Sequence, residues 1–162
     1  MKSCCGFGHR YVYQNINDTL EKEILKAIDM GCYIFYTGAM GEFDRLFASI
    51  IRKYKKEYNI KLICVKPYLT KELNENKDYY YTMYDDIIIP DELSDIFYKQ
   101  AITKRNEWII DNSDIVIGYT IHDYGGAYQA IKYAKKQNKT IFFNLITQQK
   151  KQGHRRGVLH KE

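Results

Sequence analysis

Two glycine-containing turns constrain the fold of this chain most strongly, because each joins an apolar, strand-like run to a helix-like run. The first turn is residues 37–44 (TGAMGEFD), and the second is residues 122–129 (HDYGGAYQ). Glycine lets the backbone approach a ligand closely, and a helix N-terminus offers free N–H groups with a partial positive charge. Each turn therefore has a phosphate-binding pattern, and two of them in one small domain predict a nucleotide-type ligand.

The rest of the chain repeats this alternation of strand and helix. Expected strands are residues 2–6, 32–36, 61–65, 115–119 and 140–145, and expected helices are residues 20–31, 43–58, 101–112 and 126–137. Nearly every strand residue is apolar, as in a parallel sheet that is covered on both faces. The pattern predicts an α/β protein with a single Rossmann-like, doubly wound, mainly parallel sheet and helices on both faces.

Residues 68–100 are less regular, and we expect loops, a short strand and a short helix there. This stretch includes the run Tyr79-Tyr80-Tyr81. The run is predicted to pack an irregular flank or to form an oligomer interface, with a lid over the ligand as the alternative. We expect a homo-oligomer, a dimer or larger.

Composition and charge exclude several classes of protein. The chain has 162 residues, 45% hydrophobic and 28% charged, as in folded globular proteins, and no apolar run reaches the roughly 20 residues that cross a bilayer. The net charge is +5, but residues 150–162 hold five Lys or Arg and one Glu. We therefore expect a near-neutral nucleotide-binding domain, residues 1–146, and a basic, flexible tail, residues 147–162. A basic nucleic-acid-binding face is not expected.

The four cysteines point to a reducing compartment. They form no C-x-x-C pair and have no histidine at the spacing of metal ligands. We expect buried, reduced thiols, a cytoplasmic protein without a membrane partner, no metal site and no required cofactor.

Three loops should converge on one crevice. Ligands of doubly wound sheets bind beyond the carboxyl ends of the strands, near the change in strand order. Both glycine turns, and also residues 6–10 (GFGHR) after the first strand, are expected at that edge.

The motifs resemble those of a known family. They are, in order, residues 6–10, 37–44, 105–114 (RNEWIIDNSD) and 125–127 (GGA). Over residues 2–145 the chain resembles the SLOG superfamily of Rossmann-like domains and, within it, the YpsA-like branch. The resemblance implies a nucleotide or nucleotide-derived ligand. The superfamily includes LOG-type phosphoribohydrolases, sensors of NAD-derived signals in antiphage systems and DNA-binding recombination mediators, so the fold does not select one function.

One departure from the family concerns catalysis. LOG-type hydrolases carry Pro-Gly-Gly-x-Gly-Thr-x-x-Glu at the second turn, and the glutamate is central to N-glycosidic cleavage. Here Tyr128 and Gln129 replace Gly and Thr, and Lys132 occupies the glutamate position. A lysine cannot act as the carboxylate that stabilises an oxocarbenium-like centre or activates water, so no catalytic residue is assigned by the resemblance.

The predicted ligand-binding residues come from the three loops and from the start of the motif at residue 105. They are Gly8, His9, Arg10, Thr37, Gly38, Ala39, Met40, Gly41, Asp44, Arg105, Tyr119, Tyr124, Gly125, Gly126 and Ala127. Backbone N–H groups of residues 38–41 and 125–127 would hold phosphate oxygens, Arg10 would neutralise charge, and Tyr119 or Tyr124 would contact a base or ribose.

Each assignment has a structural alternative. The glycines at 38 and 41 can serve a turn without a ligand, and Asp44 can cap a helix or brace the loop. Arg10 can pair with a surface acid, and His9 can be structural. Arg105 can form an internal ion pair with Glu107 or Asp114.

Three functions follow. The leading hypothesis is a protein that binds a nucleotide or an NAD- or ADP-ribose-derived, including cyclic, nucleotide without rapid turnover, as a sensor or as a sequestering, sponge-like anti-defence protein. The alternative is a nucleotide-processing enzyme that uses a carboxylate from elsewhere. The candidates are Glu42, Asp44, Asp114 and Asp123, of which Glu42 and Asp123 are favoured by their place in the glycine loops. The third is a nucleic-acid-binding module, in which the basic tail would carry the interaction.

Overall fold

The computed structural model describes residues 2–143. Six parallel strands form one sheet in the order β4-β3-β2-β1-β5-β6. The strands are β1 (Lys2–Gly8), β2 (Cys32–Thr37), β3 (Lys61–Val65), β4 (Asp86–Ile88), β5 (Ile115–Tyr119) and β6 (Thr140–Phe142). The helices are α1 (Asn17–Asp29), α2 (Glu42–Tyr54), α3 (Lys71–Glu75), α4 (Lys77–Met83), α5 (Tyr98–Asp111) and α6 (Gly126–Lys136), with a 3₁₀ turn η1 (Asp91–Leu93).

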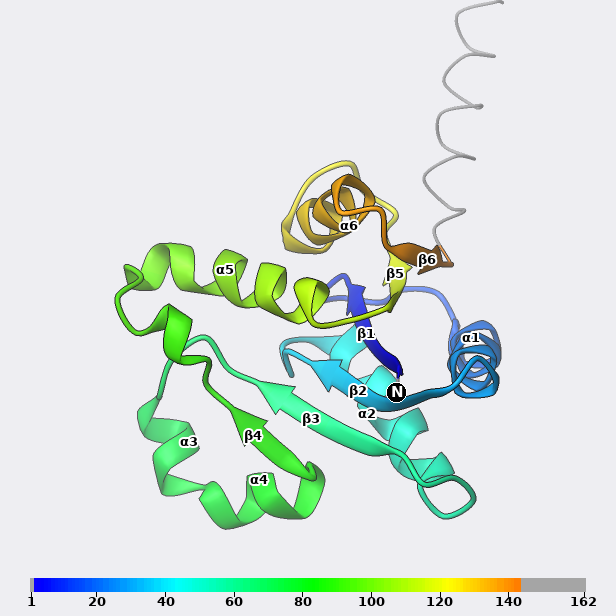
Figure 1. Cartoon of the computed structure of the whole chain (residues 1–162), viewed down its shortest axis with the longest axis horizontal. Helices are drawn as coiled ribbons and strands as arrows, with labels where there is room; N and C mark the ends of the chain where they lie inside the picture. Colours follow the sequence, from blue (N-terminus) through cyan, green and yellow to red (C-terminus); the bar gives the residue numbers. More distant parts are fainter. Residues whose placement is uncertain (1, 144–162) are drawn as a thin grey trace, which may run out of the picture.

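Helices cover both faces of the sheet, with α1 and α2 on one face and α5 and α6 on the other (Figure 1). Each face has its own buried apolar cluster. Successive residues of a strand point to opposite faces, so Cys4 belongs to the cluster under α1 and α2, and Cys5 belongs to the cluster under α5 and α6. Because both faces are buried, the strands need apolar residues at every position, and all five residues of β5 are buried.

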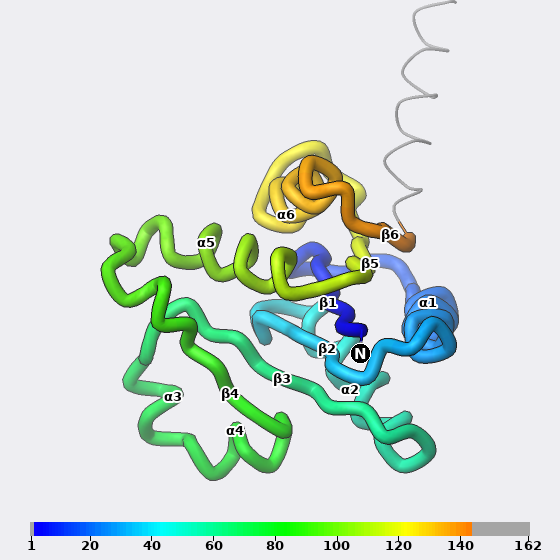
Figure 2. Tube along the Cα trace, in the orientation of Figure 1, coloured from blue at the N-terminus to red at the C-terminus, as the bar shows by residue number. Residues whose placement is uncertain are grey.

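The order of the strands changes direction beside β1. The chain runs outward from β1 through β2 and β3 to β4, then returns across the sheet through η1 and α5 to β5 on the other side of β1 (Figure 2). The carboxyl ends of β1 and β5 lie side by side, with Gly8 opposite Tyr119. A crevice at this point is the expected ligand site of such a sheet.

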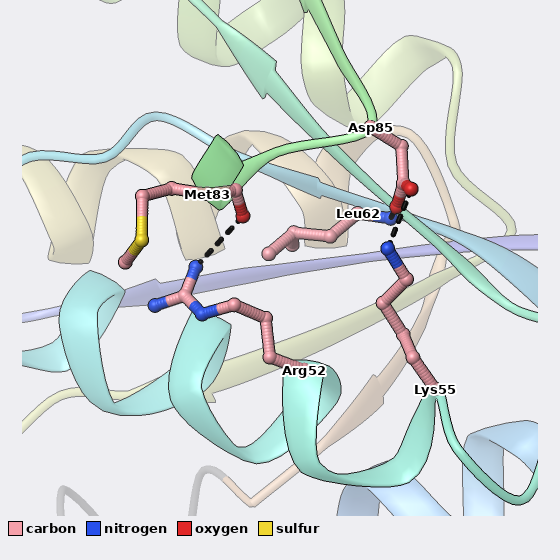
Figure 3. A network of polar contacts seen from close by, with 5 residues as sticks. All are labelled: Arg52, Lys55, Leu62, Met83 and Asp85. Carbon is pink, nitrogen blue, oxygen red and sulfur yellow. Dashed lines mark hydrogen bonds and ion pairs between the residues drawn. The ribbon is translucent and has the colours of Figure 1, made fainter. Parts of the chain in front are cut away.

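The outer strand β4 is fixed to the rest of the sheet by a polar network (Figure 3). The Asp85 carboxylate accepts hydrogen bonds from the Lys55 ammonium and from the Leu62 N–H, the latter at 2.7 Å. The Arg52 guanidinium donates to the carbonyl oxygen of Met83 at 3.0 Å. These contacts join the C-terminal end of α2 and the strand β3 to the end of α4 and to the residue that precedes β4.

The predicted α/β class and parallel sheet are confirmed, and several boundaries differ. The helix expected over residues 43–58 ends at Tyr54, and the helix expected from residue 101 begins at Tyr98. Residues 68–100 are more ordered than expected, since they contain α3, α4, β4 and η1. The last expected strand begins at Thr140 as predicted, but its residues 144–145 and the basic tail lie outside the described residues.

Two further observations concern the surroundings of the protein. Within residues 2–143, no helix has both the length and the apolar character that crossing a membrane requires. All four cysteines are buried and free of disulfides.

Candidate functional site

A crevice of about 290 Å³ opens at the carboxyl ends of β1, β2 and β5. It is bounded by the loop after β1, the first glycine turn, one face of α5 and the N-terminus of α6. Its lining residues are Phe7, Gly8, His9, Arg10, Gly38, Met40, Asp44, Ile102, Arg105, Asn106, His122, Tyr124, Gly125, Gly126 and Ala127. The crevice thus lies at the change in strand order, where the sequence predicts it.

Arg105 is a buried cation at this site. The residue is only 2% exposed, and its Nη1 donates to the carbonyl oxygens of Val65, at 2.9 Å, and Gly38, at 3.3 Å. Its Nε donates to Asn106 Oδ1 at 2.8 Å. Within residues 2–143 it has no ion pair shorter than 4.0 Å. A buried guanidinium held by neutral oxygens keeps its full positive charge, so the crevice has a built-in attraction for anions.

Asp44 is the carboxylate that lines the crevice among the described residues. Its Oδ2 accepts the Met40 N–H at 2.7 Å, and the residue is 8% exposed. Burial raises the pKa of Asp44 to about 6, against the opposing effects of the Met40 N–H and the Arg105 charge. The carboxyl group therefore changes charge near neutral pH, which is characteristic of buried acids.

The first glycine turn is packed against the protein itself. A Cβ atom at Gly38 would lie 2.9 Å from Arg105 Cζ. The Glu42 N–H, at the start of α2, donates to the carbonyl oxygen of Arg10 at 2.8 Å. Internal partners thus already occupy much of the space and several of the N–H groups that a phosphate would need at this turn.

The second glycine turn is open. A Cβ atom at Gly125 or Gly126 would meet nothing within 4 Å, and Gly125 has a φ of 92° that favours glycine. The N–H groups of Gly126, Ala127 and Tyr128 have no acceptor in the part of the chain that the structure describes. These N–H groups at the positive end of α6 are available to an anion.

His9 positions the loop that leads to the second turn. Its Nε2 accepts the N–H of Ile121 at 2.7 Å and the N–H of His122 at 3.3 Å. Burial, followed by the neighbouring His122, lowers the pKa of His9, so the imidazole is neutral with its proton on Nδ1. The rings of His9, His122 and Tyr124 follow one another at centroid distances of 4.9 Å.

Most predicted ligand-binding residues line the crevice. Four do not: Thr37, Ala39, Gly41 and Tyr119. Tyr119 has no exposed surface, because its ring is stacked between Phe43 and Phe143 in the core. The expected contact of Tyr119 with a base or ribose is therefore excluded in this conformation.

Thr37, Ala39 and Gly41, the other three residues that do not line the crevice, shape the first glycine turn. The Thr37 hydroxyl is buried and accepts the Ala39 N–H at 3.2 Å. Gly41 precedes α2, and its carbonyl oxygen accepts a hydrogen bond from the Arg45 N–H, in the first turn of that helix, at 3.2 Å. Their roles are in shaping the turn, and a ligand role for them stays a prediction.

The alternative partners of Arg105 are engaged elsewhere. Glu107 pairs with Lys104 at 3.4 Å, and Asp114 accepts the Ser3 N–H at 2.9 Å. The internal ion pair considered for Arg105 is therefore not formed with either acid.

Four lining residues are absent from the predicted ligand-binding set: Phe7, Ile102, Asn106 and His122. Phe7 and His122 belong to turns that the sequence placed at this edge. Ile102 and Asn106 lie on α5, one turn before and one residue after Arg105. The helical spacing of Ile102 from Arg105 was a usable signal, since residues at i and i+3 share a face. Asn106 directly follows Arg105 in the motif that carries the family resemblance.

Of the carboxylates considered for catalysis, Asp44 lines the crevice, whereas Glu42, Asp114 and Asp123 do not. Glu42 Oε2 accepts the Val12 N–H at 2.7 Å, which braces the loop after β1. Asp123 is exposed in the loop before α6, and Lys132 faces the groove between α5 and α6. Within residues 2–143 there is also no group of three His, Cys, Asp or Glu residues able to hold a metal ion.

Solved structures have the same fold. DNA processing protein A from Streptococcus pneumoniae superimposes with a TM-score of 0.62 at 14% identity, over 88% of this chain and 50% of that one. DNA processing protein A from Helicobacter pylori, described with a single-stranded DNA binding mode, gives 0.60 at 16% identity, over 87% and 64%. The structural-genomics target TM1055 gives 0.56 at 14% identity, over 87% and 72%.

These similarities confirm the expected Rossmann-like α/β fold, whereas the SLOG superfamily and its YpsA-like branch stay predictions. The chain spans half to about two thirds of the length of the two DNA processing proteins. No protein-family model and no curated protein matches the sequence.

Proposed function

We propose that the protein binds a phosphorylated, nucleotide-type ligand in the crevice between β1 and β5. The observation that carries the proposal is Arg105, a guanidinium that is 2% exposed, lines the crevice and has no ion pair within residues 2–143. Asp44 lines the same crevice and acts on Arg105 through its charge, but it forms no direct ion pair with the guanidinium. A buried charge without a direct ion pair is costly, and an anionic ligand in the crevice would supply one.

The phosphate would lie at the second glycine turn. The free N–H groups of Gly126 and Ala127 and the positive end of α6 form an anion site of known type, and Arg105 is the independent second feature that favours an anion there. Arg10, which is exposed and also lines the crevice, would close over the ligand from the loop after β1. Tyr124 would contact the ribose or base.

Binding without rapid turnover is the use that the chemistry favours. Asp44 is the sole carboxylate among the crevice residues of the described chain. The hydrogen bond from the Met40 N–H and the burial of the Asp44 side chain hold this carboxylate in place. The protein would act as a sensor of a nucleotide signal, including an NAD- or ADP-ribose-derived one, or as a sequestering protein. Turnover of a nucleotide that is lost in Asp44→Asn, Glu42→Gln or Asp123→Asn would make it an enzyme instead.

The proposal is tested by calorimetric titration with inorganic pyrophosphate, ADP and ADP-ribose. We expect Arg10→Ala to weaken binding about tenfold, as for loss of a charge-assisted hydrogen bond. Arg45→Ala is the matched control, since Arg45 is an exposed arginine on α2 that does not line the crevice. Equal losses of affinity in Arg10→Ala and Arg45→Ala would mean that the anion responds to the overall charge of the protein and not to this crevice. Failure of the protein to bind any of the three anions would refute the site.

Binding of single-stranded nucleic acid is the second candidate. It is favoured by the similarity to DNA processing protein A, one structure of which is described with a single-stranded DNA binding mode. Phosphates of a strand would use the same N–H groups and arginines. A labelled thymidine oligonucleotide that competes with ADP, and whose affinity falls steeply with salt, would favour this candidate. Assembly into a homo-oligomer is proposed for either function.

A further inference from the structure

A second cavity, of about 710 Å³, lies between α5 and α6 and adjoins the crevice. Three residues, Ile102, Asn106 and Gly126, line both cavities. The crevice itself, at about 290 Å³, lies at the lower limit of the roughly 300–1,000 Å³ that small-molecule sites occupy. It has room for the phosphate end of a nucleotide, and the remainder of such a ligand needs adjoining space.

The groove between α5 and α6 has the chemistry that suits a flat heterocycle. Ile102, Ile110 and Ala130 provide apolar walls, and the ring of Tyr133 provides an aromatic one. The Tyr133 hydroxyl donates to Asp111 Oδ1 at 2.8 Å, which fixes the ring in place. A nucleobase needs apolar or aromatic surface for its faces and hydrogen-bonding groups for its edge.

Amide groups supply the hydrogen-bonding partners. The Oδ1 of Asn106 accepts from Arg105 Nε at 2.8 Å, so its Nδ2 points away from the guanidinium and has no acceptor among residues 2–143. Asn106 therefore holds the buried cation with one end and offers two donors at the junction of the cavities with the other. Gln129, on α6, adds a second amide within the groove.

We propose that this groove is the base subsite of the same ligand, so that the phosphate lies at the N-terminus of α6 and the nucleobase lies between α5 and α6. The inference rests on the proposed function. It commits the groove to the ligand because the two cavities are adjacent and share Asn106 as a lining residue, and Asn106 accepts a hydrogen bond from the anion-attracting Arg105.

The test compares pyrophosphate with ADP by calorimetry on the full chain. We expect wild-type protein to bind ADP at least about tenfold more tightly than pyrophosphate, as base stacking in a preformed site provides. Thr103 is exposed and lines the groove from α5, so Thr103→Trp fills the groove from the surface. We expect Thr103→Trp to bring ADP within about threefold of pyrophosphate and to leave pyrophosphate binding unchanged.

Two further variants keep the test decisive. Lys99→Trp places the same side chain on an exposed position of α5 outside the groove and should keep the wild-type preference for ADP. Gln129→Trp fills the groove from α6 and should have the same effect as Thr103→Trp. If one of the two variants folds poorly, the other provides the test.

The outcomes separate the two proposals. Failure of wild-type protein to bind either anion overturns the proposed function. Binding of pyrophosphate with no preference for ADP, or an ADP preference that survives both groove-filling substitutions, overturns the base subsite alone. If both substitutions convert an oligomer into a monomer in analytical ultracentrifugation and leave the ADP preference intact, the groove is a subunit interface and the inference is wrong.

Discussion

The guanidinium of Arg105 lies directly against Gly38, a residue 67 positions earlier in the chain, and donates a hydrogen bond to its carbonyl oxygen. A side chain at position 38 would occupy the place of the guanidinium, since its Cβ would lie 2.9 Å from Arg105 Cζ. The first glycine turn thus makes room for a protein cation, while the second leaves room for a ligand.

This difference between the turns predicts that a glycine-to-alanine substitution changes the free energy of unfolding in opposite directions at the two turns. Gly38→Ala should displace Arg105, lower the free energy of unfolding by about 1–3 kcal/mol as overpacking does, and weaken pyrophosphate binding. Gly126→Ala adds its Cβ to open space at the first position of α6, so it should change stability by about 1 kcal/mol or less, in the stabilising direction. Urea unfolding followed by Trp108 fluorescence measures both. Equal losses of stability would contradict the distinction between a packed turn and an open one.

The strands and the position of the site were predictable because they depend on local pattern. Runs such as residues 61–65 and 115–119 are largely apolar, and the structure has β3 and β5 with those same bounds. The carboxyl ends of parallel strands then converge wherever the chain reverses its direction of winding, which predicts the crevice.

The division of roles within the site was not predictable, because it depends on packing between distant segments. Nothing near Gly38 in the sequence indicates that Arg105 fills the space beside it. Tyr119 is the last residue of β5 and precedes a loop, yet it is buried because Phe43 of α2 and Phe143 enclose its ring. Such contacts join segments that are far apart in the sequence, and the periodicity of apolar residues within one segment does not report them.

Asp44 should make stability depend on pH in a defined direction. Its pKa in the folded protein, about 6, lies above the ordinary value of 3.8. The folded state therefore binds this proton more tightly than the unfolded state, and the carboxyl group destabilises the fold increasingly as pH rises from about 4 to about 6. An asparagine side chain at this position would still accept the Met40 N–H and cannot ionise. We expect Asp44→Asn to match wild type near pH 4 and to be about 1–3 kcal/mol more stable above pH 7.

Urea unfolding at pH 4 and pH 7.5 measures this difference. Asp95→Asn is the control, since Asp95 is exposed in the loop before α5 and its substitution should have no such pH dependence. A stability difference for Asp44→Asn that is constant across this range would contradict the assigned burial of the charge.

His9 should couple the loop before α6 to pH. Its folded pKa lies below the ordinary 6.5 because of burial and of His122, so its contribution to stability is present above about pH 6.5 and is lost as pH falls through the folded pKa. Protonation of Nε2 removes the acceptor for the Ile121 and His122 N–H groups. After correction for intrinsic rates, we expect hydrogen exchange of these two amides to accelerate more than about tenfold at low pH.

The matched comparison uses His9→Phe, which lacks the acceptor at every pH. In this variant both amides should exchange fast at pH 7.5 and show no further acceleration on acidification. The Val116 amide, in the buried strand β5, is the internal reference. Acceleration of Val116 by the same factor would indicate general unfolding and contradict a local role for His9.

The Asp85 network should stabilise the fold without contributing to the site (Figure 3). The Leu62 N–H donates to Asp85 at 2.7 Å, and Asp85→Ala leaves this donor without its acceptor. We expect a loss of about 1–3 kcal/mol in the free energy of unfolding. Lys55→Ala removes only a partly exposed ion pair and should cost about 1 kcal/mol or less.

Urea unfolding of the two variants, with pyrophosphate titration alongside, tests this separation of stability from binding. Neither Asp85 nor Lys55 lines the crevice or the groove between α5 and α6, so the affinity for pyrophosphate should stay within about twofold of wild type, at temperatures where each variant is folded. A selective loss of affinity in Asp85→Ala would mean that β4 and the segment before it control the site. An equal cost of both substitutions would assign the stabilisation to the ion pair, whereas the larger cost of Asp85→Ala assigns it to the hydrogen bond that holds β3.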